Sequence, residues 1–119
     1  MKATTQLTEA QEQALVIEWA QYNPRLKWLH AIPNGGSRDK REAANLKRQG
    51  VKPGVSDLSL PLPCRGYHGL YIEMKRTKGG TVSPKQREFI ADMTANGYYA
   101  AVCKGAQEAI KLIEWYIKE

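Results

Sequence analysis

Asp57, Glu73 and Lys75 are the residues of this chain whose types and spacing suit chemistry on a phosphate group. Asp57 opens a run in which leucines alternate with other residues, and Glu73 and Lys75 lie in a second run of this kind, residues 70–75. Such alternation predicts two β-strands and puts side chains two residues apart on one face. Glu73 and Lys75 therefore share a face, and a strand that begins at Asp57 can pair with theirs.

Two carboxylates beside an ammonium group suit a divalent metal ion. At about 4 Å, two carboxylates repel by roughly 4 kcal/mol at an effective dielectric constant of about 20, and a shared cation keeps both ionised. Mg²⁺ or Mn²⁺ meets that demand. The alternative is a solvated cross-strand charge pair between Glu73 and Lys75, which the Glu-x-Lys spacing by itself favours.

The residues around this group resemble a known nuclease pattern. Gly54-x-x-Asp57 followed by Glu73-x-Lys75 resembles the PD-(D/E)xK nuclease superfamily. Ser56 stands where the superfamily pattern has proline, but the metal chemistry does not use that side chain. The departure therefore leaves the expected ligands in place.

Longer stretches extend the resemblance to nearly the whole chain. They look like the virus-type replication-repair nuclease (VRR-NUC) family in its compact, phage-borne form, and they comprise Ile32–Gly36, Lys40–Ala44 and Gly50–Leu58. The resemblance implies a PD-(D/E)xK restriction-endonuclease-like α/β core, a mixed central β-sheet flanked by helices. It also implies a metal-dependent endonuclease that hydrolyses phosphodiester bonds in structured DNA, acts on Holliday junctions as a homodimer, and is encoded by a phage or prophage.

Eight elements must position these residues, in the order helix, strand, helix, strand, strand, helix, strand, helix. Apolar periodicity and turn residues place them at about 9–22, 27–32, 39–49, 57–62, 70–75, 84–96, 98–103 and 105–117. In the strand predicted over 27–32, one face carries Trp28, His30 and Ile32. In the first helix, Thr8 is the expected N-cap, and at 100° per residue the buried stripe is Leu15, Val16 and Trp19.

Glu12 falls in the middle of that stripe. A buried carboxylate is costly without compensation. A metal site, an ion pair with Lys or Arg, or partial exposure in a first turn whose dipole favours acids would each account for it. Given Asp57 and Glu73, and the acid that the family resemblance places on the first helix, we expect Glu12 to be a third metal ligand. Glu9, about 60° away around the helix, is the alternative.

Gln86 has two possible roles. Ser83 and Pro84 open a helix, and Gln86 is then the partner of Ser83 in a capping box. The same side chain lies on the stripe that faces the sheet, together with Phe89, Ile90 and Met93. In the nucleases that this chain resembles, a glutamine or lysine at this place accompanies the active site.

A net charge of +6 on 119 residues indicates a polyanionic partner, with nucleic acid ahead of a membrane. The glycines after Pro33 let backbone N–H groups approach a phosphate, although an ordinary turn is the alternative. Cations seven residues apart form one face of the helix at 39–49, which is suited to a DNA backbone but is often simply solvated. The expected DNA-contacting residues are His30, Asn34, Gly35, Gly36, Arg38, Lys40, Arg41, Lys47, Arg48, Lys52, Lys78 and Lys85.

The family resemblance assigns the roles in catalysis. Lys75 would orient or deprotonate the attacking water and offset charge in the transition state, and Gln86 would help to place the water or Lys75. One or two Mg²⁺ or Mn²⁺ ions would be held by Glu12, Asp57, Glu73 and the backbone carbonyl of Met74.

Length and composition predict a single VRR-NUC-like domain over residues 1–119. We expect it to stay in the cytoplasm, and the resemblance to phage-borne nucleases implies a bacterial host cell. No apolar run reaches transmembrane length, no signal-peptide core follows Met1, and Cys64 and Cys103 are expected to be reduced thiols. An exposed face with Leu112 and Trp115 suits a contact between two subunits. Two other functions stay open: a basic nucleic-acid-binding module without catalysis, and a structural or interaction protein that uses the Trp115 face.

Overall fold

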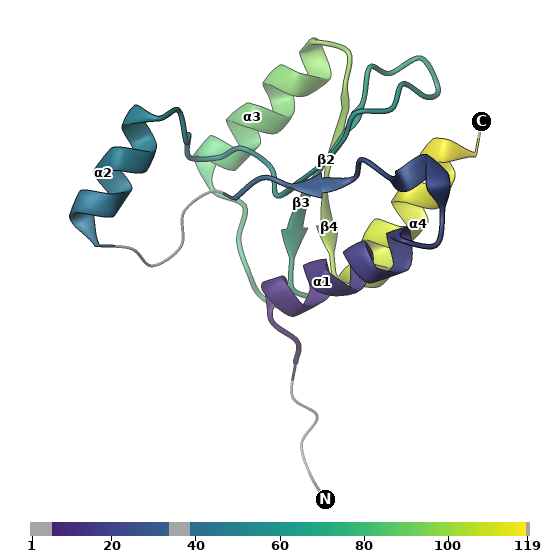
Figure 1. The fold of residues 1–119 in the computed structure, drawn as a ribbon, viewed down its shortest axis with the longest axis horizontal. Helices are drawn as coiled ribbons and strands as arrows, with labels where there is room; N and C mark the ends of the chain where they lie inside the picture. The colour runs from purple at the N-terminus through teal and green to yellow at the C-terminus, as the bar shows by residue number, and fades with distance from the viewer. Residues whose placement is uncertain (1–5, 34–38, 119) are drawn as a thin grey trace, which may run out of the picture.

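A mixed four-stranded sheet forms the centre of the protein (Figure 1). The computed structural model describes residues 6–33 and 39–118. The strands lie in the order β1 (His30–Ala31), β2 (Leu58–Leu60), β3 (Leu70–Lys75) and β4 (Tyr99–Lys104). The pairs β1–β2 and β2–β3 are antiparallel, whereas β3 and β4 are parallel. This arrangement confirms the predicted mixed sheet.

The helices are α1 (Glu9–Ala20), α2 (Lys40–Arg48), α3 (Pro84–Ala95) and α4 (Ala106–Ile117), with a short 3₁₀ turn, η1, at Pro24–Leu26. Capping boxes start two of them, with Thr8 before α1 and Ser83 before α3, as predicted. No helix in residues 6–33 or 39–118 is long and apolar enough to cross a membrane.

Strand β3 presents different chemistry on its two faces. Leu70, Ile72 and Met74 are buried in one core with residues of α1 and α4. Alternate residues face α3, where Tyr71 meets Phe89 edge to face with ring centroids 5.1 Å apart. The polar residues Glu73 and Lys75 follow Tyr71 at intervals of two and share its face. The helix α3 therefore covers the face that carries the candidate chemistry, and α1 and α4 cover the other.

The strand predicted over residues 27–32 is mostly wrong. Only His30 and Ala31 form β1, and Trp28 is 68% exposed rather than packed on a strand face. The Asn23 side chain accepts a hydrogen bond from the Arg25 N–H, and this turn, together with Pro24, starts η1. The turn changes the phase of the chain, so that Leu26 and Leu29 enter the core instead.

The buried stripe of α1 also differs from the predicted one. Val16 and Glu12 are buried as expected, but Leu15 is 43% exposed and Ala20 takes part in the core. Residues four apart on a helix lie on one face, and this face packs on α4. Ala20 continues the face of Glu12 and Val16, and Leu15 falls outside it.

Helix α2 stands away from the sheet (Figure 1). None of its residues is buried, and its N-cap is the Asp39 side chain, which accepts from the Glu42 N–H. The predicted cationic face is therefore open to a partner.

Candidate active site

Asp57 lies opposite Glu73 at the point where β2 begins. The register pairs Leu58 with Ile72, which continues to Asp57 and Glu73. The Met74 N–H donates to Asp57 Oδ2 at 2.7 Å, and the Ile32 N–H donates to the Asp57 carbonyl oxygen at 2.8 Å. The first bond holds the Asp57 side chain against β3, and the second holds its backbone beside the end of β1.

Glu73 is buried and is contacted from three directions. Gln86 Nε2 donates to Glu73 Oε2 at 3.0 Å, and Lys75 Nζ lies 3.6 Å from the same oxygen. Burial, and then the neighbouring Asp57 carboxylate, raise the pKa of Glu73 from 4.5 to about 8, although Lys75 acts in the opposite direction. The geometry therefore places two acids together that resist being ionised at once.

The second oxygen of this carboxylate, Glu73 Oε1, is buried and has no hydrogen-bond partner within the described residues. A buried carboxylate oxygen normally has a hydrogen-bond partner, because leaving it without one costs about 1–3 kcal/mol, and more when the group is charged. Divalent cations such as Mg²⁺ take carboxylate oxygens as ligands. An unsatisfied oxygen beside Asp57 is thus the atom that a bound cation would be expected to contact.

Gln86 completes the capping box and also contacts Glu73. Its Oε1 accepts from the Ser83 N–H at 2.9 Å, and its own N–H donates to Ser83 Oγ at 3.1 Å, which completes the capping box. The remaining amide nitrogen is free to donate to Glu73. The start of α3 and the acidic pair are therefore joined by one side chain.

Lys75 is 7% exposed, so its charged group is held inside the site rather than in solvent. A β-carbon placed on Gly80 would lie 3.6 Å from Lys75 Cδ and 3.9 Å from Glu9 Oε2. Both side chains thus border Gly80, which brings Glu9 of α1 to the Lys75 side of the site.

Glu12 contacts the start of α4, and its expected grouping with Asp57 and Glu73 around a metal ion stays a prediction. The Ala106 N–H, in the first turn of α4, donates to Glu12 Oε1 at 2.9 Å. Gly105 precedes α4 and offers no side chain as a cap. Glu12 therefore meets the positive end of the α4 dipole. Within residues 6–33 and 39–118, no cluster of three or more His, Cys, Asp or Glu side chains is arranged to hold a metal ion.

The profile of the VRR-NUC domain family matches residues 7–107 of the sequence. The chain belongs to the VRR-NUC domain family. A solved structure described as a VRR_NUC domain protein is similar to it, with 34% sequence identity and a TM-score of 0.84, over 96% of this chain and 91% of that one. No curated protein matches the sequence.

Membership in this family confirms the resemblance drawn from the sequence and implies a nuclease-type function with DNA as substrate. The α/β fold of this VRR-NUC domain, with its mixed sheet between helices, agrees with that of the solved relative.

Most of the cations expected to contact DNA in this VRR-NUC domain are exposed. Those in the described part are Lys40, Arg41, Lys47, Arg48, Lys52, Lys78 and Lys85. His30 is exposed too, and its Nδ1 donates to the Trp28 carbonyl oxygen at 2.8 Å. Asn34, Gly35, Gly36 and Arg38 lie outside the described residues. These contacts with DNA stay predictions.

Ser56 is a residue that sequence reasoning set aside. It is 1% exposed, and its hydroxyl has no hydrogen-bond partner within the described residues. The hint in the sequence was a polar residue directly before Asp57, where the superfamily pattern has an apolar one. Ser56 therefore places an unsatisfied polar atom one residue away from an acid of the site.

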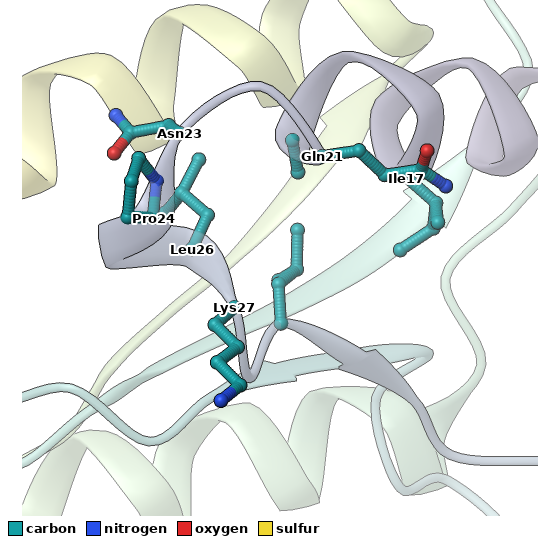
Figure 2. Close-up of a pocket in the computed structure, with 8 residues that line it drawn as sticks. Ile17, Gln21, Asn23, Pro24, Leu26 and Lys27 are labelled. Carbon is teal, nitrogen blue, oxygen red and sulfur yellow. The ribbon is translucent and has the colours of Figure 1, made fainter.

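A hollow of about 460 Å³ lies elsewhere in the VRR-NUC domain, between the end of α1 and η1 (Figure 2). Ile17, Leu26 and other mainly apolar or amide residues line it, and Lys27 is its one charged lining residue. Because it contains no acid, it is not the place for metal-dependent chemistry, and the candidate active site remains the group around Glu73.

Proposed function

We propose that this protein is a metal-dependent DNA endonuclease that hydrolyses phosphodiester bonds. The observation that carries the proposal is the pairing of Asp57 with Glu73, whose buried Oε1 has no partner among the described residues. A cation between the two acids would satisfy that oxygen and remove their mutual repulsion.

Asp57, Glu73 and the carbonyl of Met74 would hold Mg²⁺ or Mn²⁺. In a strand, the N–H and C=O of one residue point to the same side. Because the Met74 N–H points at Asp57, its carbonyl faces the same side. The bound ion would polarise the phosphate and lower the pKa of a water molecule.

The protein's own groups would do the rest of the work. Lys75 Nζ, held inside the site near Glu73, would orient the attacking water and offset negative charge that develops on the phosphate. Gln86 would fix the orientation of the Glu73 carboxylate through its hydrogen bond. Each of these groups comes from β3 or α3, so their spacing is set by regular structure.

Glu9 is the better candidate for the acid that α1 contributes, because it borders Gly80 together with Lys75. Glu12 is occupied at the start of α4. We therefore propose that Glu9 takes the role first expected for Glu12. The variants E9Q and E12Q, which change the same group on the same helix, separate the two assignments: E9Q should lose cleavage and E12Q should retain it.

The proposed substrate is structured DNA, in particular Holliday junctions, which a homodimer would resolve. The protein would be encoded by a phage or prophage and would act in the cytoplasm of the bacterial host. Trp115 is 40% exposed on α4, although Arg65 and Tyr99 contact its ring within the chain. Multi-angle light scattering tests the dimer, and a monomer at high protein concentration would contradict it.

A basic nucleic-acid-binding module without catalysis is the rival, and the net charge of +6 favours it. Purified protein is incubated with labelled duplex, flap and four-way junction DNA, in Mn²⁺ and in EDTA. The proposal predicts cleavage that requires Mn²⁺ and that is abolished by K75A while DNA binding persists. Binding without cleavage in Mn²⁺, or cleavage that K75A retains, would contradict the assigned roles.

A further inference from the structure

A groove of about 440 Å³ lies between α3 and the chain that runs from α2 to β2. Three lysines line it, and each comes from a different segment: Lys47 from the last turn of α2, Lys52 from the connection to β2, and Lys85 from the first turn of α3. All three are exposed residues. Ammonium groups brought together from three segments favour an anionic occupant, and phosphate groups fit this requirement.

The same groove has an apolar floor. Pro53, Val55 and Phe89 contribute it, and the edge-to-face contact with Tyr71 holds the Phe89 ring in place. A groove that combines cations with an aromatic ring suits a nucleotide, because a base can stack on the ring while its phosphate meets the cations. A paired base in a duplex cannot enter, since its faces are already stacked on neighbouring bases.

The acids that line the groove favour one orientation of a bound nucleotide. Glu88 and Asp92 line the same wall of α3 as Lys85, and Asp92 lies about 10 Å further along the helix at 1.5 Å per residue. Lys85 Nζ lies 3.5 Å from Glu88 Oε1, an exposed pair of little strength. Carboxylates repel phosphate but accept hydrogen bonds from the amino groups of bases. The phosphate is therefore favoured near the lysines and the base edge near the acids.

The residues that line the groove are close to the acidic site along the chain. Gly54 packs so closely on the Lys85 backbone that a β-carbon there would lie 2.4 Å from the Lys85 carbonyl oxygen. The chain then runs from Val55, in the floor, directly to Asp57, and Gln86 follows Lys85 in α3. One wall of the groove thus leads along the chain to Asp57, and the other leads to Gln86, which donates to Glu73.

We propose that this groove holds an unpaired nucleotide of the DNA strand next to the bond that is cut. The proposal rests on the nuclease function proposed above. Among structured DNAs, it favours those with a single-stranded segment beside a duplex, such as a flap or fork, over a fully paired four-way junction.

Binding measured without metal tests the groove independently of cleavage. Fluorescence anisotropy in EDTA compares a labelled duplex that carries a single-stranded flap with the same duplex fully paired. The double variant K47A/K52A is matched by K111A/K118A, which removes the same charge from α4 and its C-cap residue on the other face of the sheet. A third variant, F89L, keeps the apolar volume and removes the ring.

The wild-type protein is expected to bind the flap substrate more tightly than the duplex. K47A/K52A should weaken flap binding and reduce its salt slope by about 0.7 for each DNA phosphate that the lysines no longer neutralise, whereas K111A/K118A should not. F89L should weaken flap binding about fivefold or more and leave duplex binding unchanged. Absence of a flap preference, equal effects of the two lysine doubles, or equal weakening of binding to both DNAs in F89L would overturn the proposal. A wild-type protein that prefers the flap but cuts no DNA in Mn²⁺ would overturn the proposed function and leave the groove assignment standing.

Discussion

Removal of the Glu12 carboxylate tests the finding that this acid caps α4. The side chain is 6% exposed and accepts the Ala106 N–H at 2.9 Å, across 94 residues of sequence. E12A would leave that buried N–H without a partner, which costs on the order of 1–3 kcal/mol, and would lose the charge at the helix N-terminus, worth about 1 kcal/mol more. E12Q keeps an oxygen acceptor and should lose only the charge contribution.

These free energies correspond to measurable changes in Tm. An unfolding entropy of about 2.1 cal/mol/K per residue gives a shift of roughly 4 °C for each kcal/mol in a chain of 119 residues. We therefore expect a decrease in Tm of roughly 8–16 °C in E12A and of about 4 °C in E12Q, measured by circular dichroism without divalent metal. The deciding result is that E12A lowers the Tm more than E12Q does.

Activity distinguishes a cap from a metal ligand. Well below its Tm, E12Q should cleave DNA at nearly the wild-type rate, whereas the matched variant E9Q should show a normal Tm and abolished cleavage. An E12Q protein with unchanged Tm and abolished cleavage would refute the reasoning, because the carboxylate would then act in the site and not at α4.

Three further outcomes follow from the structure. G54A should destabilise the protein by roughly 2 kcal/mol or more in a denaturant titration, since the residue has a φ of +92° and its new β-carbon would meet the Lys85 backbone; an unchanged midpoint would contradict the packing. Because the pKa of Glu73 is raised from 4.5 to about 8, the folded protein holds a proton that the unfolded chain has lost between these values, so Tm without metal should fall as pH rises through this range. Mn²⁺ should remove this fall by binding the ionised pair, and the fall should be smaller in E73Q. Burial raises the pKa of Cys103 to about 12, so iodoacetamide should leave this thiol unmodified at neutral pH until the protein is unfolded, and rapid labelling of the native protein, detected by mass spectrometry, would argue against that burial.

The part of the site that the sequence predicted depends on local patterns. The two-residue period of the strands puts Glu73 and Lys75 on one face, and the antiparallel register brings Asp57 opposite Glu73. Capping rules identified Gln86, and its place on the sheet-facing stripe anticipated its contact with Glu73. Short-range rules suffice here because each of these residues is positioned by the element that contains it.

Two features of the structure depend on contacts that local patterns do not contain. Glu12 accepts a hydrogen bond from the start of α4. Gly105 has no side chain to cap that helix, so the cap comes from α1, and the sequence alone does not show that α1 packs beside α4. The run at residues 27–32 alternates like a strand, but the turn at Asn23 and Pro24 shifts its phase. In both cases, a contact or turn outside the pattern decided which side chains are buried.

The divided hydrogen bonding of the Gln86 amide links folding to chemistry. Its oxygen belongs to the beginning of α3 and its nitrogen to Glu73, so fraying of that first turn would also release the carboxylate. A change at Ser83 that never touches DNA or metal would therefore alter the orientation of the acidic pair, and its effect would be recorded as reduced turnover well before any loss of the native state became visible.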